Sequence, residues 1–361
     1  MNKKFQKRLN ELGKLSGYQK PIQIDDVLKL DSNENLAIKK EFQIELIREA
    51  VKRTDIRTYP LGAVENFMNS LAKYFKVPKN MISVGNGSDQ ILDLILANLC
   101  TKSTKILTSD PTFGFFEERC KLYSIKQVKI PFLKNMDLRI EDFIKKAKSV
   151  DMIYLDSPNN PTGFQFSNRD LEKLIKSFSG PIIIDEAYGE FSNSSVLNLV
   201  KKHPNIILVK TLSKAFGLAG LRIGYMIADK KITEVFSNII QYPYPLNSLA
   251  IECGILAIEK SKQITSVLET IKKQRVRIIQ SLKKYDAFDV FDSNANFVLF
   301  DAKGADARVY NALVEQGISI RKLGKLGSHK GCLRVTIGTP EMNSKFLLAI
   351  RDLLEWQKIL F

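Results

Sequence analysis

The sequence has few of the residues that build metal centres and disulfide frameworks. It contains two histidines and four scattered cysteines, none of them in a C-x-x-C pair: Cys100, Cys120, Cys253 and Cys332. Neither a zinc knuckle nor the disulfide scaffold of a secreted domain is therefore indicated, and we predict no metal site. Reduced thiols in a cytoplasmic protein are the simplest interpretation.

Long hydrophobic runs are also absent. The N-terminal stretch MNKKFQKRLNELGKL is positively charged, but no apolar stretch follows it, as would be needed in a signal peptide. No later apolar run approaches the length that spans a bilayer. We therefore expect neither a cleaved leader nor a membrane partner.

Acidic residues are outnumbered, since 39 Asp and Glu face 55 Lys and Arg, for a formal net charge of +16. The lysines are spread along the chain, often beside Glu or Asp, and no stretch interleaves basic residues with aromatics. This pattern is typical of a solvated surface, so we expect no nucleic-acid partner. A basic balance also attracts small phosphorylated or carboxylated substrates.

Short apolar runs alternate with segments of helical period, without internal repeats or a flexible linker. The runs predicted as strands are MISVG (81–85), TKILTS (104–109), DMIYL (151–155), PIIID (181–185), NIILV (205–209) and IGYMIA (223–228). In ENFMNSLAKYF, by contrast, Phe67, Leu71 and Phe75 recur every fourth residue, as on one face of a helix. The alternation predicts an α/β fold with a largely parallel sheet between helices.

The character of the chain changes near residue 250, where a long helical stretch (247–285) precedes NFVLF, ISIRK, CLRVTIG and a closing helix from Pro340. This pattern predicts a smaller α/β C-terminal domain at 251–361, after a large domain at 41–250. Residues 1–40 look irregular, and we expect an N-terminal arm that joins the small domain or a partner subunit.

The segment TLSKAFGLAGLRIGY (211–225) contains one lysine directly after a predicted strand. Lysine forms a Schiff base with a carbonyl group, and it must be partly deprotonated to do so. Arg222, eight positions after Lys214, would lower the pKa of that lysine while it binds an anionic group. Taken alone, Lys214 could equally be an ordinary surface lysine in a loop.

A carboxylate ends the apolar strand PIIID, at the sheet edge where α/β proteins bind ligands. Asp185 in this position suits pyridoxal phosphate, whose ring nitrogen needs a carboxylate partner because the protonated ring is the electron sink. Tyr188 could then donate a hydrogen bond to the phenolic oxygen of the ring. The alternative is that Asp185 only caps the next turn.

Two further turns are suited to binding a cofactor. In DSPNNPTGFQF (156–166), two prolines fix the backbone around Asn159 and Asn160, so that an amide can reach a ring oxygen. In GNGSDQILDL (85–94), the chain passes two glycines and enters a helix at Ser88, where free backbone amides bind phosphate. The Gly-Lys-Ser/Thr ending of a P-loop is missing.

These segments, in this order and with the aromatic of DPTFGFF between them, resemble the fold-type I, aspartate-aminotransferase-like superfamily of pyridoxal-phosphate enzymes. The resemblance covers nearly the whole chain. It implies a large domain that binds pyridoxal 5'-phosphate, a small C-terminal domain and aminotransferase activity, with Lys214 as the lysine that holds the cofactor.

Within the superfamily the chain is most similar to histidinol-phosphate aminotransferases, through NEN (33–35), RTYP (57–60), YPYPLN (242–247) and CLRVTIGT (332–339). The resemblance implies that Phe113 stacks on the cofactor ring. It also implies that the following residues hold the cofactor phosphate: Gly87, Ser88, Asp89, Thr211, Ser213 and Arg222. Tyr59 would reach the phosphate of the neighbouring subunit's cofactor, which implies a homodimer with shared active sites.

The same resemblance implies the substrate contacts. Arg334 would clamp the α-carboxylate of the amino-acid donor in a bidentate fork, a geometry that lysine cannot supply. Arg321 and Tyr18 match positions at the phosphate end of a small phosphorylated substrate, and Asn33 and Asn160 would also contact the substrate. Either Arg321 or Arg334 could instead form a salt bridge at the rim.

The expected reaction moves an amino group between glutamate and a phosphorylated ketone in amino-acid biosynthesis. The loop NENLAI lacks the proline usual after NEN, so the ketone could be imidazole acetol phosphate or a smaller one such as dihydroxyacetone phosphate. Decarboxylation of a phosphorylated amino acid, of the phosphoserine or phosphothreonine type, is the nearest alternative. A non-enzymatic binding module would have no need of Lys214, Asp185 and both arginines together.

Overall fold

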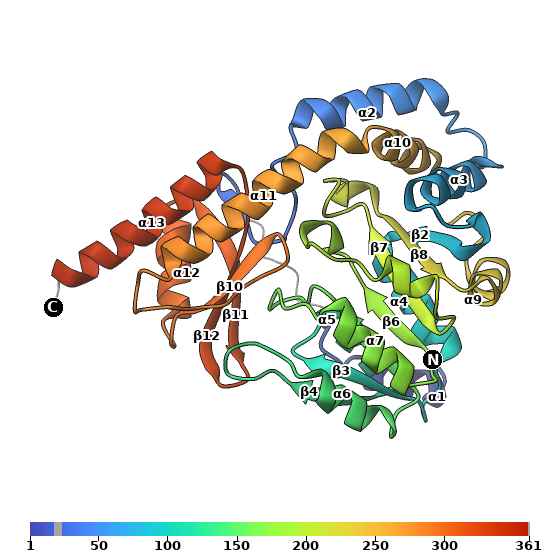
Figure 1. Cartoon of the computed structure of the whole chain (residues 1–361), viewed down its shortest axis with the longest axis horizontal. Helices are drawn as coiled ribbons and strands as arrows, with labels where there is room; N and C mark the ends of the chain where they lie inside the picture. Colours follow the sequence, from blue (N-terminus) through green and yellow to red (C-terminus); the bar gives the residue numbers. More distant parts are fainter. Residues whose placement is uncertain (18–23, 360–361) are drawn as a thin grey trace.

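The computed structural model describes residues 1–17 and 24–359, so Tyr18, a predicted substrate contact, lies outside the described residues. Two β-sheets organise the described chain, and Figure 1 shows each of them with its own helices. Among the described helices, none combines the length and the apolar character that crossing a membrane requires.

The larger sheet has seven strands in the spatial order β2-β8-β7-β6-β5-β3-β4. In chain order they are β2 (Ile82–Asn86), β3 (Lys105–Asp110), β4 (Lys126–Pro131), β5 (Met152–Asp156), β6 (Ile182–Asp185), β7 (Ile206–Thr211) and β8 (Ile223–Ala228). Neighbouring strands are parallel except at β8, which is antiparallel to both β2 and β7. The predicted α/β fold with a largely parallel sheet is confirmed.

Helices cover both faces of this sheet because its central strands are apolar on both sides. Along β6, Ile182 and Ile184 belong to one hydrophobic cluster and Ile183 to another. The helices that surround the sheet are α2 (Lys40–Arg53), α3 (Ala63–Phe75), α4 (Gly87–Leu99), α5 (Gly114–Leu122), α6 (Ile140–Ala147), α7 (Asn168–Ser177), α8 (Leu197–Val200), α9 (Lys230–Val235) and α10 (Ser248–Glu259). Shorter helical turns lie between them: η1 (Lys79–Met81), η2 (Gly189–Phe191), η3 (Ala219–Leu221) and the π-helical η4 (Phe236–Ile240).

The second sheet has the order β1-β11-β12-β10-β9. Its strands are β1 (Leu28–Leu30), β9 (Asp289–Val290), β10 (Phe297–Asp301), β11 (Ile318–Leu326) and β12 (His329–Thr336), accompanied by the helices α11 (Ser261–Leu282), α12 (Asp306–Glu315) and α13 (Pro340–Ile359). β1 pairs with β11 in parallel, whereas the other pairs are antiparallel. A segment near the N-terminus thus completes a sheet made from the last quarter of the chain.

Two expectations about helices need correction. The N-terminal forty residues are more regular than the sequence suggested, because they contain α1 (Lys3–Leu12) in addition to β1. The predicted stretch at 247–285 is two helices, α10 and α11, which meet at Lys260. In Figure 1, α11 runs from the helices of the large sheet to the second sheet. The domain boundaries at residues 40 and 250 stay a prediction.

Candidate active site

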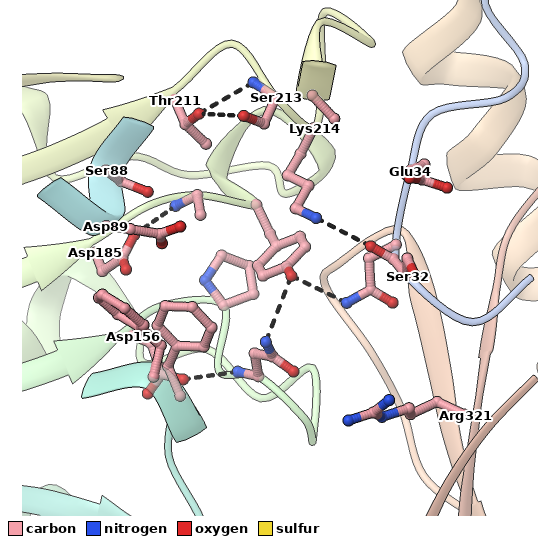
Figure 2. A pocket seen from close by; sticks show the side chains of 18 of the residues that line it. Ser32, Glu34, Ser88, Asp89, Asp156, Asp185, Thr211, Ser213, Lys214 and Arg321 are labelled. Atoms are coloured by element: carbon pink, nitrogen blue, oxygen red, sulfur yellow. Dashed lines mark hydrogen bonds between the residues drawn. The ribbon is translucent and has the colours of Figure 1, made fainter. Parts of the chain in front are cut away.

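The carboxyl ends of the central strands open into a cavity of about 560 Å³ that residues of both sheets line (Figure 2). The structure brings most of the predicted site residues together in its wall: Asn33, Ser88, Asp89, Phe113, Asn160, Asp185, Tyr188, Thr211, Ser213, Lys214, Arg222, Arg321 and Arg334. Residues separated by up to 301 positions thus meet at one place. This place is the crevice at the carboxyl ends of the strands, where α/β sheets bind ligands.

Lys214 lies three residues after the end of β7, and its amine points into the cavity. The Nζ atom donates a hydrogen bond of 3.0 Å to the backbone carbonyl of Ser32. Burial, together with the positive charge of Arg334, lowers the pKa of Lys214 to about 8. A sizeable fraction of the amine is therefore neutral near physiological pH, as a nucleophile requires.

Asp185 is the last residue of β6, and its side chain is almost completely buried at the floor of the cavity. Its Oδ1 accepts a hydrogen bond of 3.0 Å from the Ala187 amide, and its Oδ2 accepts one of 3.2 Å from the Tyr154 hydroxyl. Burial, together with the nearby carboxylate of Asp156, raises the pKa of Asp185 to about 7. A cation placed beside Asp185 would offset this cost, so the site fits a protonated ring nitrogen.

The Tyr188 hydroxyl lies at the centre of a polar group that connects the two sheets. It accepts a hydrogen bond of 2.9 Å from Asn33 Nδ2 and a longer one of 3.5 Å from Asn160 Nδ2. Lys214 Nζ lies 5.8 Å from the centre of the Tyr188 ring. Tyr188 and Asn160 are therefore placed where both can reach a ring oxygen near the amine.

A close approach of two backbones shapes the start of helix α4. Gly87 has a φ of +80°, and a Cβ atom there would lie 2.5 Å from Arg222 Nη2. On the neighbouring strand β8, a Cβ at Gly224 would lie 2.2 Å from the carbonyl carbon of Gly87 and 2.3 Å from the amide nitrogen of Ser88. The missing side chains leave the α4 amides open toward the cavity, a geometry that suits a phosphate group.

Hydroxyl groups and one guanidinium lie around the same open amides at the start of α4, and together they form a phosphate cradle. Thr211 Oγ1 lies 2.9 Å from Ser213 Oγ and accepts a hydrogen bond of 3.0 Å from the Ser213 amide. Arg222 donates to Ser213 Oγ over 3.4 Å and forms an ion pair of 2.8 Å with Asp89. A helix start, two hydroxyls and an arginine are a donor set that fits a phosphate dianion.

Two arginines lie on the opposite side of the cavity, on the second sheet. Arg321 on β11 and Arg334 on β12 are directly paired in the antiparallel register. Arg334 donates hydrogen bonds of 2.6 Å to Asn160 Oδ1 and 3.0 Å to the Asp31 carbonyl, and its guanidinium lies 5.1 Å from the centre of the Phe297 ring. These contacts fix the planar group of Arg334 at the cavity wall.

Some predicted residues are not in the wall of the cavity. Gly87 lies beside it, at the start of α4. The Tyr59 ring is 70% exposed outside the cavity and stacks on Tyr244, with ring centres 4.5 Å apart and an interplanar angle of 12°. The predicted contacts of Tyr59 with a neighbouring subunit and of Tyr18 with substrate stay predictions.

The cavity also contains residues that sequence reasoning did not select: Asp31, Ser32, Glu34, Phe115, Asp156, Pro158, Ala187, Ala219 and Gly220. Asp31, Ser32 and Glu34 flank Asn33, so the NEN motif was the available signal. Asp156 opens the motif DSPNNPTG and ends an apolar run, as Asp185 does. That parallel could have identified Asp156 as a second carboxylate at the same sheet edge.

This fold and donor set define a fold-type I pyridoxal-phosphate enzyme. The model of the family described as aminotransferase class I and II matches residues 25–350, and the chain belongs to this family. Its members use pyridoxal 5'-phosphate, and the protein is a pyridoxal-phosphate-dependent aminotransferase, as predicted.

Among curated relatives, the histidinol-phosphate aminotransferase of Thermoanaerobacter pseudethanolicus is 33% identical over 328 residues, which cover 90% of this chain and 93% of that protein. The solved histidinol-phosphate aminotransferase of Clostridium acetobutylicum is 28% identical, with a TM-score of 0.81 over 90% of this chain and 98% of that one. The L-threonine-O-3-phosphate decarboxylase of Porphyromonas gingivalis shares the fold, with 24% identity and a TM-score of 0.79 over 91% of this chain and all of that one (100%). The predicted resemblance to histidinol-phosphate aminotransferases is confirmed.

Proposed function

We propose that this aminotransferase moves an amino group between glutamate and a small phosphorylated ketone of the imidazole acetol phosphate type. The observation that supports this substrate class is the pair of arginines opposite Lys214. Arg334, fixed by Asn160, would bind the α-carboxylate of glutamate, and Arg321 beside it would bind the phosphate of the ketone. The similarity to histidinol-phosphate aminotransferases supports the same choice and a role in amino-acid biosynthesis.

The residues of the cavity would hold the cofactor at several points. When bound, pyridoxal phosphate supplies an aldehyde that links to amines and a ring that takes up electrons from the Cα–H bond. Asp185 would bind the ring nitrogen, Tyr188 and Asn160 the ring oxygen, and Phe113 the face of the ring. The phosphate would be bound by the cradle at the start of α4: the amides of Gly87 and Ser88, the hydroxyls of Thr211 and Ser213, and Arg222 held by Asp89.

Lys214 performs the proton transfers in this proposal. Its amine would hold the cofactor through the aldehyde until a substrate amine takes its place. In the neutral form, the freed amine would accept the proton from the substrate Cα and hold it for return to the other side of the reaction. Arg334 keeps the substrate oriented during both steps, because its two parallel hydrogen bonds fix a carboxylate in one plane.

The identity of the ketone is tested by half-reactions. The amine form of the enzyme is mixed with imidazole acetol phosphate, dihydroxyacetone phosphate or 2-oxoglutarate, and the return of the aldehyde form is followed by absorbance. We expect imidazole acetol phosphate to react fastest among the phosphorylated ketones. A faster reaction with dihydroxyacetone phosphate would assign the smaller substrate, for which the unusual NENLAI loop (33–38) is the supporting feature.

Decarboxylation of a phosphorylated amino acid is the second candidate, since the Porphyromonas decarboxylase shares the fold. Both reactions would depend on the lysine that holds the cofactor, and they differ in which bond of the substrate is broken. Glutamate alone distinguishes them: a transaminase converts its cofactor to the amine form, whereas a decarboxylase leaves it unchanged. Release of carbon dioxide from phosphothreonine or phosphoserine would support the decarboxylase.

We also propose that the protein is a homodimer with shared active sites. Apolar side chains are exposed around the start of α3 and the segment before α10: Ile56, Tyr59, Leu61, Tyr242 and Tyr244. Such a patch supports burial against a second copy. Tyr59 on this patch would reach the cofactor phosphate of the neighbouring subunit.

A further inference from the structure

Asp156 stands beside Asp185 at the floor of the cavity. The two residues end neighbouring parallel strands, β5 and β6, and are register partners, so their side chains leave the sheet on the same face. Both line the cavity, and the exposed fraction of Asp156 is only 7%. In Figure 2 both carboxylates lie on the large-sheet side, opposite Arg321.

Three donors from two loops converge on the Asp156 carboxylate. Oδ1 accepts hydrogen bonds of 2.9 Å from the Thr112 hydroxyl and 2.9 Å from Asn159 Nδ2, and Oδ2 accepts one of 2.8 Å from the Asn160 amide. Thr112 immediately precedes Phe113, and Asn160 itself lines the cavity. The carboxylate therefore connects the loop before α5 to the turn after β5.

The charge of Asp156 also acts on Asp185. Burial raises the pKa of Asp156 to about 6, against the opposing effect of its hydrogen bonds, so the group is largely ionised at neutral pH. Its negative charge in turn raises the pKa of Asp185. The other groups that face the pair are the Tyr154 hydroxyl on β5 and the carboxylate of Asp89 on α4, whose charge is offset by Arg222.

We propose that Asp156 is a positioning residue for the transamination. It fixes the loops that contain Phe113 and Asn160 around the cofactor ring, and it places a second negative charge next to Asp185. The proton on the ring nitrogen is then stabilised by two neighbouring carboxylates, although only Asp185 touches it. This inference rests on the proposed role of Asp185 as the partner of the ring nitrogen.

Asp156→Asn tests the proposal with two measurements. In the apoprotein, the carboxyl carbon of Asp185 is titrated by NMR, and we expect its transition to move to lower pH because the neighbouring negative charge is gone. In the holoenzyme, we expect kcat for the glutamate half-reaction to fall about tenfold, the order of effect when a charged hydrogen-bonded partner is lost, with little change in KM. Asp170→Asn, the same substitution on α7 and away from the cavity, should change neither quantity.

An unchanged Asp185 transition together with an unchanged kcat in Asp156→Asn would overturn the proposal. If this variant does not fold, Thr112→Val takes its place. Loss of one donor raises the pKa of Asp156, so that less of its negative charge remains beside Asp185. The Asp185 transition should therefore also move to lower pH, by a smaller amount, and an unmoved transition would again overturn the proposal.

Asp185→Asn is measured in parallel. Full activity there would refute the role of Asp185, whereas an inactive Asp185→Asn with a normal Asp156→Asn refutes only the present inference.

Discussion

Arg321 and Arg334 are directly opposite each other on the antiparallel strands β11 and β12, and both line the cavity into which Lys214 points. Like charges in this arrangement repel each other across the strands, which costs stability. An anionic substrate group bound beside the pair would reduce that repulsion, as the proposed function requires.

The two arginines should affect different substrates. Arg334→Lys removes the bidentate fork, and we expect KM for glutamate to rise roughly 10- to 100-fold, from the loss of a charge-assisted hydrogen bond worth about 1.5–3 kcal/mol. Arg321→Lys should raise KM for the phosphorylated ketone by a comparable factor and leave that for glutamate nearly unchanged. Steady-state kinetics with each substrate varied in turn measures both; equal effects of either variant on both substrates would contradict the assignment.

Replacement of Lys214 should stop the proton transfers. We expect Lys214→Ala to lower the rate of the glutamate half-reaction by at least about 10³-fold, because general acid–base catalysis alone contributes roughly 10²–10⁴-fold. Stopped-flow absorbance of the holoenzyme measures this rate. Lys230→Ala, on the exposed α9, is the control and should react at the normal rate; substantial turnover by Lys214→Ala would refute the mechanism.

Capture of the cofactor by the apoprotein should depend on pH through Lys214. Only the neutral amine attacks an aldehyde, so with a pKa of about 8 the capture rate should rise with pH and level off above it. Arg334→Gln removes a positive charge that lowers this pKa, so its profile should move to higher pH. The rate is followed by cofactor absorbance between pH 6 and 10, and identical profiles for the two proteins would exclude electrostatic coupling between Arg334 and the amine.

The close approach of β8 to the start of α4 should make Gly224 sensitive to substitution. Gly224→Ala places a Cβ against backbone atoms that cannot rotate away, so we expect a loss of about 1–3 kcal/mol in the free energy of unfolding and weaker cofactor binding. Gly220→Ala is the matched control for stability, because a Cβ there meets nothing within 4 Å. Urea unfolding measures both variants, and cofactor titration measures Gly224→Ala against the unsubstituted protein. Equal stability of the two variants would show that β8 and the start of α4 can move apart at little cost.

Shared active sites can be tested by mixing two inactive variants. Lys214→Ala lacks the amine, and Tyr59→Phe lacks the hydroxyl that would reach the partner's cofactor. In a mixed dimer one site has both defects and the other has neither, so subunit exchange should restore up to about a quarter of the normal activity. No recovery after verified exchange would place Tyr59 and Lys214 in the same site of one subunit, or Tyr59 outside both.

The strands of the large sheet could be predicted because burial on both faces demands continuous apolar runs. The run at 223–228 coincides with β8, and the run at 181–185 differs from β6 by one residue. Edge strand β4 (Lys126–Pro131) was missed because its sequence, KQVKIP, is half exposed and has no continuous apolar run. The pairing of β1 with β11 joins segments about 290 residues apart and leaves no local signal.

Some residues of the site could be predicted from the sequence, and others could not. Lys214, Asp185 and Asn160 lie in motifs with a chemical reason for each residue, and the structure places all three in one cavity. Asp156 was overlooked because an acid at the end of a strand also reads as a turn residue. Its importance depends on the register with Asp185, which no local pattern reveals.

The parallel pairing of β1 with β11 attaches the segment before Ser32 to the sheet that contains Arg321 and Arg334. The Ser32 carbonyl, which accepts the Lys214 hydrogen bond, is therefore attached to the same sheet as the two arginines. Lys214 itself follows a strand of the other sheet. Any rotation of one sheet against the other changes two things at once: the hold on an anionic substrate and the restraint on the amine. A movement that closed the cavity around a ligand would therefore also alter the hydrogen bond that restrains the reactive nitrogen.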